Sequence, residues 1–121
     1  IVNEVHRGKY VALRVKGVSM DDGTSNAILP NSIVSCRELQ MVHWKDKLRI
    51  KKFPYWAIAT KESSYPLLKQ ITHHDVEKGV ITCHSKNTGP EYQDFELSLN
   101  EVTALFYVVD INRSISDKNY F

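Results

Sequence analysis

Ser19 and Lys69 are the two residues of this 121-residue chain whose types could perform catalysis together. A serine hydroxyl is a weak nucleophile until a neighbouring base takes its proton, and a lysine amine is such a base only when it is neutral. The stretch Gly17-Val18-Ser19-Met20 follows a strand-like run and precedes a polar turn. If the two side chains meet, the serine could act as a nucleophile with the lysine as its base.

The residues around Lys69 favour a neutral amine. Side chains two positions apart share one face of a strand, so Lys69 shares its face with Leu67 and Ile71. These apolar neighbours should face the core, and burial disfavours the ammonium form, which lowers the pKa of a lysine. Lys69 is therefore the predicted general base.

The turn around Ser19 could also supply hydrogen-bond donors. Backbone N–H groups in a turn are not used by a strand ladder, so those of Ser19 and Met20 could form an oxyanion hole. Most serines in turns and most lysines in strands have no chemical role, so spacing alone is weak support for a catalytic pair.

Alternating apolar and polar residues predict a single domain over residues 1–121, mainly β, built of twisted antiparallel strands with little helix. The expected strands, separated by turns rich in Gly, Pro, Asn and Asp, cover residues 10–15, 33–36, 55–60, 65–71, 80–83, 95–99 and 102–111. Residues 41–52 show no decided pattern and are expected to be irregular. The run 102–111 is apolar on both faces, which predicts a central strand or an interface.

Composition excludes several classes of protein. The net charge of +2 is too small for the whole domain to be a nucleic-acid binder, and no apolar run is long enough to cross a membrane. Cys36 and Cys83 lie in apolar runs without the spacing of a disulfide framework, which predicts a cytoplasmic protein. The chain begins with Ile1, so we expect a piece of something longer.

Two further groups of residues could bind a ligand. Histidine, cysteine and carboxylate are usual metal ligands, but their spacing here is wrong for a metal site, so neither a metal nor a cofactor is expected. This group comprises His73, His74, Asp75, Cys83 and His84. The basic stretch 45–52, with Trp44 and Tyr55 nearby, could contact phosphates and stack on bases, or could be a solvated edge.

Three stretches of the chain carry a resemblance to a known family. The first is Gly17-Val18-Ser19-Met20, the second is the turn at 30–34, and the third is Leu68-Lys69-Gln70-Ile71. In order and context they resemble the serine and lysine motifs of the self-cleaving C-terminal domains of LexA, UmuD and phage-type repressors. The similarity extends weakly from about residue 10 to residue 113.

The resemblance implies a LexA C-terminal-domain-like fold and a self-cleaving serine peptidase. Ser19 would be the nucleophile, Lys69 the general base, and the N–H groups of Ser19 and Met20 the oxyanion hole. Members of the family usually dimerise and cleave an Ala-Gly or Cys-Gly bond in their own chain when RecA filaments activate them. This implies a homodimer, RecA as a possible activator, and DNA binding only through a separate N-terminal domain.

The chain departs from the family pattern in three ways. Asn31-Ser32 stands where the family usually has Gly-Asp, and the segment between the serine and the lysine is longer than in LexA. The chain also contains no Ala-Gly or Cys-Gly pair, so the cleavable segment and any helix-turn-helix are expected upstream. Two alternatives remain open: a dimerisation module that does not cleave, and a UmuD-like polymerase accessory subunit.

Overall fold

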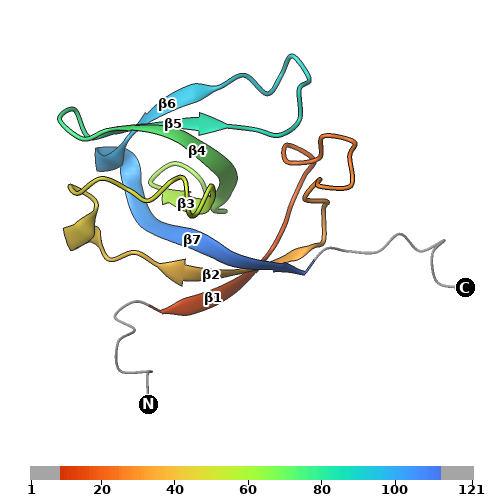
Figure 1. Cartoon of the computed structure of the whole chain (residues 1–121), viewed down its shortest axis with the longest axis horizontal. Coiled ribbons are helices and arrows are strands. Elements are labelled where there is room, and N and C mark those ends of the chain that lie inside the picture. Colours follow the sequence, from red (N-terminus) through yellow and green to blue (C-terminus); the bar gives the residue numbers. More distant parts are fainter. Residues whose placement is uncertain (1–8, 113–121) are drawn as a thin grey trace, which may run out of the picture.

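The computed structural model describes residues 9–112, which form one seven-stranded antiparallel sheet (Figure 1). The prediction of a mainly β fold is confirmed. Along the sheet the strands follow the order β1-β2-β7-β3-β4-β5-β6. Their bounds are β1 Tyr10–Arg14, β2 Ile33–Glu38, β3 Tyr55–Thr60, β4 Leu67–Asp75, β5 Val80–His84, β6 Phe95–Ser98 and β7 Val102–Asn112, with two 3-10 turns, η2 Met41–His43 and η3 Leu99–Glu101.

β7 is the central strand of the sheet. It pairs with β2 on one side and with β3 on the other, although both come much earlier in the chain. A strand with neighbours on both sides and packing on both faces has few positions left for polar residues. This accounts for the apolar pattern of residues 102–111 and confirms the prediction of a central strand, whereas an interface at this strand stays a prediction.

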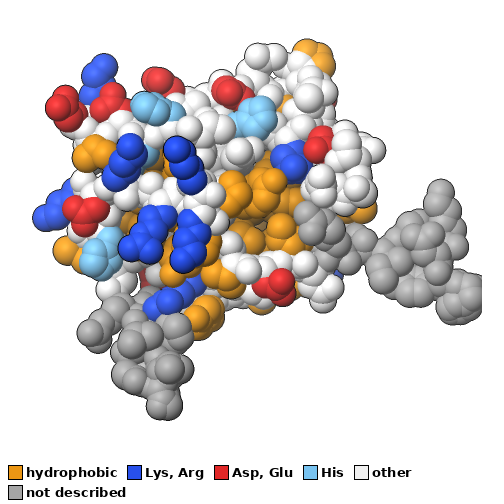
Figure 2. All heavy atoms as spheres, viewed as in Figure 1, with side chains coloured by type: hydrophobic (Ala, Val, Ile, Leu, Met, Phe, Trp, Pro, Cys, Tyr) orange, Lys and Arg blue, Asp and Glu red, His pale blue; other side chains and the backbone are white. Residues whose placement is uncertain are grey.

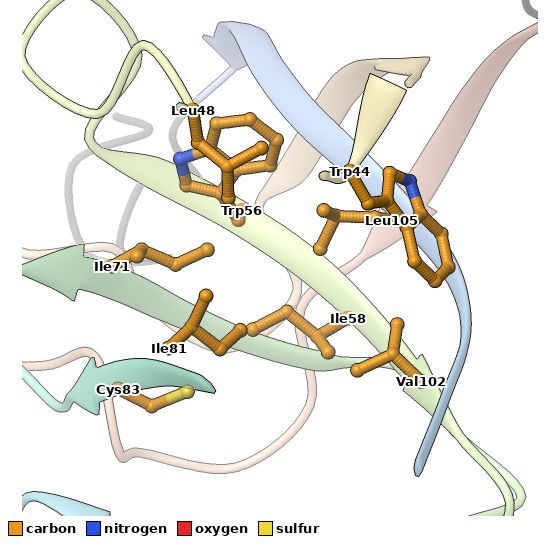
Figure 3. Close-up of a cluster of buried hydrophobic side chains, with 9 residues drawn as sticks. All are labelled: Trp44, Leu48, Trp56, Ile58, Ile71, Ile81, Cys83, Val102 and Leu105. Atoms are coloured by element: carbon orange, nitrogen blue, oxygen red, sulfur yellow. The ribbon is translucent and has the colours of Figure 1, made fainter. Parts of the chain in front are cut away.

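The curved sheet packs a hydrophobic cluster against each face. Consecutive residues of β3 point to opposite faces, so Trp56 enters one cluster and Ala57 the other. The first cluster lies inside the curve of the sheet (Figure 3), where Leu48 lies near Trp56 and Trp44 lies beside Leu105. Both faces of the sheet are therefore covered, one by the segment 41–54 and the other by the loop between β1 and β2.

The segment 41–54 covers the first cluster. Trp44 and Leu48 are buried, and the indole N–H of Trp44 donates to the carbonyl oxygen of Leu39 at 2.8 Å. The backbone N–H of Leu48 donates to Nδ1 of the buried His74 on β4 at 3.2 Å. Apart from η2 the segment is irregular, as predicted, yet these contacts fix it to the sheet.

The loop between β1 and β2 covers the second cluster. Met20 and Ile28 of this loop are buried there, and the N–H of Ile28 donates to the carbonyl oxygen of Met20 at 2.9 Å. The loop closes where the N–H of Asn31 donates to the carbonyl oxygen of Val15 at 2.9 Å. Asn31 has a φ of 72°, which is a left-handed conformation. Apart from glycine, asparagine is one of the few residues that adopt it readily. Asparagine at this position therefore permits the turn without a glycine.

No helix in residues 9–112 is long and apolar enough to cross a membrane.

Candidate functional site

Ser19 lies in a tight turn directly after β1. The N–H of Asp21 donates to the carbonyl oxygen of Val18 at 3.0 Å, which makes Ser19 and Met20 the two central residues of a β-turn. Gly17, with a φ of 76°, provides the left-handed conformation by which the chain enters this turn. The N–H groups of the central residues take no part in the turn's own hydrogen bond. Within residues 9–112 neither of them donates elsewhere, so both remain available to an acceptor, and the oxyanion hole stays a prediction.

The turn is held in place from a distant part of the chain. The backbone N–H of Asn87 donates to the carbonyl oxygen of Ser19 at 2.9 Å, and its side-chain amide donates to that of Val18 at 3.0 Å. The Met20 side chain, 1% exposed, anchors the turn in the second cluster. Backbone and core contacts therefore fix the position of the serine.

A second contact joins the loop that carries Ser19 to the loop after β5 that carries Asn87. The Lys86 amine lies 3.6 Å from a carboxylate oxygen of Asp22 and donates to the Tyr55 hydroxyl at 3.1 Å. Asp22 in turn accepts from the hydroxyl and the N–H of Thr24, and these hydrogen bonds hold the pKa of its carboxyl below the usual value. The loop that carries Ser19 and the loop after β5 are thus connected at two points.

Lys69 is buried in the middle of β4, as predicted from its apolar neighbours. Lys69 is only 9% exposed and lies on the same face of the sheet as the first cluster, to which Ile71 belongs. Its paired residue on the neighbouring strand β3 is Trp56. Burial lowers the pKa of its amine, and the nearby Cys83 opposes that effect only in part. The physical basis for a neutral lysine base is therefore present.

Ser85 is the hydrogen-bond partner of Lys69, and no sequence motif had indicated it. The Lys69 amine donates to the Ser85 hydroxyl at 2.9 Å, and Ser85 is only 3% exposed. Ser85 directly follows β5, whose pairing with β4 places His84 opposite Gln70 and hence Ser85 beside Lys69. No pattern in the sequence could have indicated this partner, because a bulge between Ile71 and His73 shifts the register of β4 and β5 by one residue.

Ser19 and Lys69 are not hydrogen-bonded to each other. The amine contacts Ser85, and two residues further along the chain Asn87 contacts the Ser19 turn. One short loop therefore touches both predicted catalytic residues. Leu68, which points to the opposite face of β4 from Lys69, lines the cavity beside Ser19. The structure brings the two residues to the same loop but not into direct contact.

A cavity of about 150 Å³ lies beside Ser19. Its walls are mainly apolar and include residues of β1, β3, β4 and the Ser19 turn. Two basic residues also line it, Arg14 on β1 and Lys16 just after β1. The exposed Tyr65 also lines it, and the Lys16 amine lies 4.9 Å from the centre of the Tyr65 ring. A cavity of this size beside a serine could receive a short apolar side chain.

Other nucleophiles and ligands in the described residues do not assemble a site. Cys36 and Cys83 are free and buried, and burial raises the pKa of each thiol to about 11, which keeps them protonated and unreactive. Within residues 9–112 no three metal-binding side chains converge. Nδ1 of His84 lies 2.6 Å from Oδ1 of Asp94 in an exposed pair.

Comparison with models of protein families, with curated proteins and with solved structures finds no match to this chain.

Proposed function

We propose that this chain is the self-cleavage and dimerisation domain of a LexA-like or phage-repressor-like regulator, with Ser19 as nucleophile and Lys69 as general base. The observation that carries the proposal is the buried Lys69 amine, which donates to the Ser85 hydroxyl at 2.9 Å. Ser85 lies on the same loop as Asn87, which hydrogen-bonds to the Ser19 turn. A buried lysine needs a reason, because burying an ammonium group opposes folding. A catalytic base is such a reason.

The reaction would proceed through an acyl-enzyme. The neutral Lys69 amine takes the Ser19 hydroxyl proton while the oxygen bonds to the scissile carbonyl carbon, and the N–H groups of Ser19 and Met20 stabilise the oxyanion. When the peptide C–N bond breaks, Lys69 returns the proton to the leaving amine. Water then hydrolyses the ester, with Lys69 again as base.

Ser85 has a positioning role in this scheme. Its hydroxyl accepts a hydrogen from the Lys69 amine, so the nitrogen lone pair remains available for the Ser19 proton. For transfer, the amine must move from Ser85 toward Ser19 or contact both when a substrate segment occupies the site. Ser85 itself is a poor candidate nucleophile because it is 3% exposed, whereas Ser19 is partly exposed and lines a cavity.

An activated ester tests this chemistry without a peptide substrate. We expect p-nitrophenyl acetate to acetylate Ser19, at a rate that rises with pH as the Lys69 amine loses its proton. The modified peptide is identified by fragment mass spectrometry. Hydroxylamine removes an ester at Ser19 but not an amide at surface lysines, which separates the expected product from background acetylation.

Variants assign the roles. Ser19→Ala should abolish the hydroxylamine-sensitive product, and Lys69→Met should reduce its rate by about 100-fold or more. Ser85→Ala should slow the reaction less, and Ser25→Ala, in an exposed part of the same loop, should not change it. If acetylation persists in Ser19→Ala and disappears in Ser85→Ala, Ser85 is the nucleophile and the proposal is wrong.

A dimerisation module that does not cleave is the second candidate, and the same experiment separates it. The direct partner of Lys69 is Ser85 rather than Ser19, which is the observation in its favour. Such a module would leave Ser19 unmodified at every pH, while sedimentation would still show a dimer.

A further inference from the structure

We propose that the segment 45–52 and the hollow beside it bind single-stranded nucleic acid, a function that does not depend on the proposed peptidase. Five of the sixteen basic residues of the chain lie in these eight positions, with Asp46 as the single acid. The segment therefore carries a net charge of +4, and the rest of the chain has a net charge of −2. Positive charge is concentrated on one surface.

The structure fixes these cations in place. Leu48 is buried in the first cluster, Ile50 packs against it, and the N–H of Phe53 donates to the carbonyl oxygen of Arg49 at 2.9 Å. Because apolar residues anchor the segment from beneath, the basic side chains between them point outward. All five are exposed, namely Lys45, Lys47, Arg49, Lys51 and Lys52. Figure 2 shows Lys and Arg side chains gathered over the region that the segment occupies in Figure 1.

These cations have no carboxylate partners in residues 9–112. The ion pairs of the described residues involve His84 and Lys86 instead. The Lys52 amine lies 5.5 Å from the centre of the Phe53 ring, which is a contact with an aromatic face rather than with an acid. Uncompensated cations on a fixed surface attract a polyanion, and its release of counterions drives binding.

A hollow of about 400 Å³ with an aromatic wall opens beside the cations. Lys47 and Arg49 line it together with Phe53 and Tyr107, whose ring centres are 4.4 Å apart. Phe53 and Tyr107 are partly exposed. Cations beside accessible aromatic rings are the combination that single-strand binding proteins use, because an unpaired base can stack while its phosphates are neutralised. A duplex keeps its bases stacked, and an acidic peptide would use the cations without needing the rings.

Fluorescence anisotropy with a labelled oligothymidylate of about fifteen nucleotides tests the proposal on the 121-residue chain. We expect binding at about 50 mM salt that weakens steeply toward about 200 mM. The double variant Arg49→Gln/Lys51→Gln should bind about tenfold more weakly and reduce the slope of log K against log salt by about 1.4. Absence of binding at the lower salt would overturn the proposal.

The matched control removes two exposed charges from the edge strand side of the sheet. Lys9→Gln/Arg14→Gln makes the same change in net charge, and its affinity and salt slope should remain those of the natural chain. An equal loss in both double variants would show that overall charge, and not this surface, causes binding. Ser19→Ala should bind normally, so failure of the peptidase proposal and failure of this one are distinguishable.

The aromatic hollow is tested separately. Phe53→Leu keeps an apolar side chain but removes the ring, and affinity for the single strand should fall about fivefold or more. Urea unfolding monitors whether the variant is folded. Duplex of the same length should bind more weakly and be insensitive to Phe53→Leu. Displacement of the oligonucleotide by poly-glutamate at equal charge concentration would identify the surface as one for acidic proteins and contradict the proposal.

Discussion

Burying the Lys69 amine lowers the stability of the fold, and no carboxylate of the described residues hydrogen-bonds to this amine to offset that loss. The amine is buried beside Ile71 and Cys83, and its hydrogen-bond partner is the neutral hydroxyl of Ser85. A neutral acceptor stabilises an ammonium group less than a carboxylate would. A residue that lowers stability in this way is typical of functional sites, where the stability cost is retained because the chemistry needs it.

Replacing this lysine should therefore stabilise the protein in a pH-dependent way. The unfolded lysine keeps its proton up to pH of about 10.5, while burial lowers the pKa in the folded state. Between the two pKa values the unfolded chain binds more protons, so the stability of the natural chain rises with pH. The variant Lys69→Met/Ser85→Ala, which leaves no hydroxyl unpaired, should be more stable at pH 7 by about 1 kcal/mol or more.

Urea unfolding at about pH 7 and about pH 10 measures this difference. The advantage of the variant should shrink at the higher pH, because a pH of about 10 is close to the pKa of the unfolded lysine and folding then has to remove a proton that is already weakly held. Ser85→Ala alone is the control, because it leaves the lysine in place. An advantage that is the same at both pH values would contradict a protonation effect.

At the scale of elements, one bulge decides the surroundings of Lys69. β4 and β5 pair Asp75 with Val80 next to their turn, and that register, continued without interruption, would place Lys69 opposite Lys86. The bulge between Ile71 and His73 shifts the pairing by one residue and brings Ser85 there instead. Sequence periodicity predicts that Lys69 faces the core, but it cannot reveal a bulge, so the direct partner of the lysine was not predictable.

The segment 41–54 depends on a titratable side chain. Nδ1 of His74 accepts the N–H of Leu48 at 3.2 Å, which requires an unprotonated Nδ1. Burial, together with the charges of His73 and Lys47, lowers the pKa of His74, and Asp75 opposes this shift. The neutral ring then carries its hydrogen on Nε2, which is buried with no hydrogen-bond partner among the described residues. A second proton would have to bind Nδ1 and would break the hydrogen bond from Leu48.

The protein should consequently lose stability in mild acid. The unfolded histidine binds its proton near pH 6.5, and the folded one only at lower pH, so stability falls as pH falls through that window. The loss should be about 1 kcal/mol, the usual contribution of one hydrogen bond. His74→Asn, whose Oδ1 can accept from Leu48 without titrating, should flatten the pH dependence of the urea midpoint.

The exposed neighbour on β4 provides the control for this prediction. His73→Gln removes an exposed ring whose charge contributes to the lowered pKa of His74, so the pH dependence of the urea midpoint should become smaller but persist in this variant. If His74→Asn and the natural chain lose the same stability between about pH 7 and about pH 5, protonation of His74 is not the cause of the loss, and the prediction is wrong.

At the scale of the whole molecule, the strands could be predicted and their order in the sheet could not. Each run with a period of two became a strand within a few residues of its predicted bounds, because that period reflects burial on one face. The hairpin of β3 and β4 was also predictable, since a short polar turn joins two apolar runs. The insertion of β7 between β2 and β3 depends on contacts between residues far apart in sequence, which no local pattern encodes.

The candidate site shows the same division. The exposed turn at Ser19 and the burial of Lys69 follow from local sequence, and both are found in the structure. The hydrogen bonds of Ser85 and Asn87 come from the loop after β5, whose approach to the Ser19 turn is a property of the assembled sheet. Local sequence could therefore indicate the two candidate residues but not the residues that hydrogen-bond to them.

The central place of β7 has a consequence for how the protein is made. During synthesis β2 and β3 leave the ribosome long before the strand that joins them, and until then each exposes an unpaired edge. The sheet cannot close before residue 112 has emerged, so its folding must follow translation of β7. Nascent chains released before Val102 should be unfolded and readily digested by protease, whereas chains released after Asn112 should resist it.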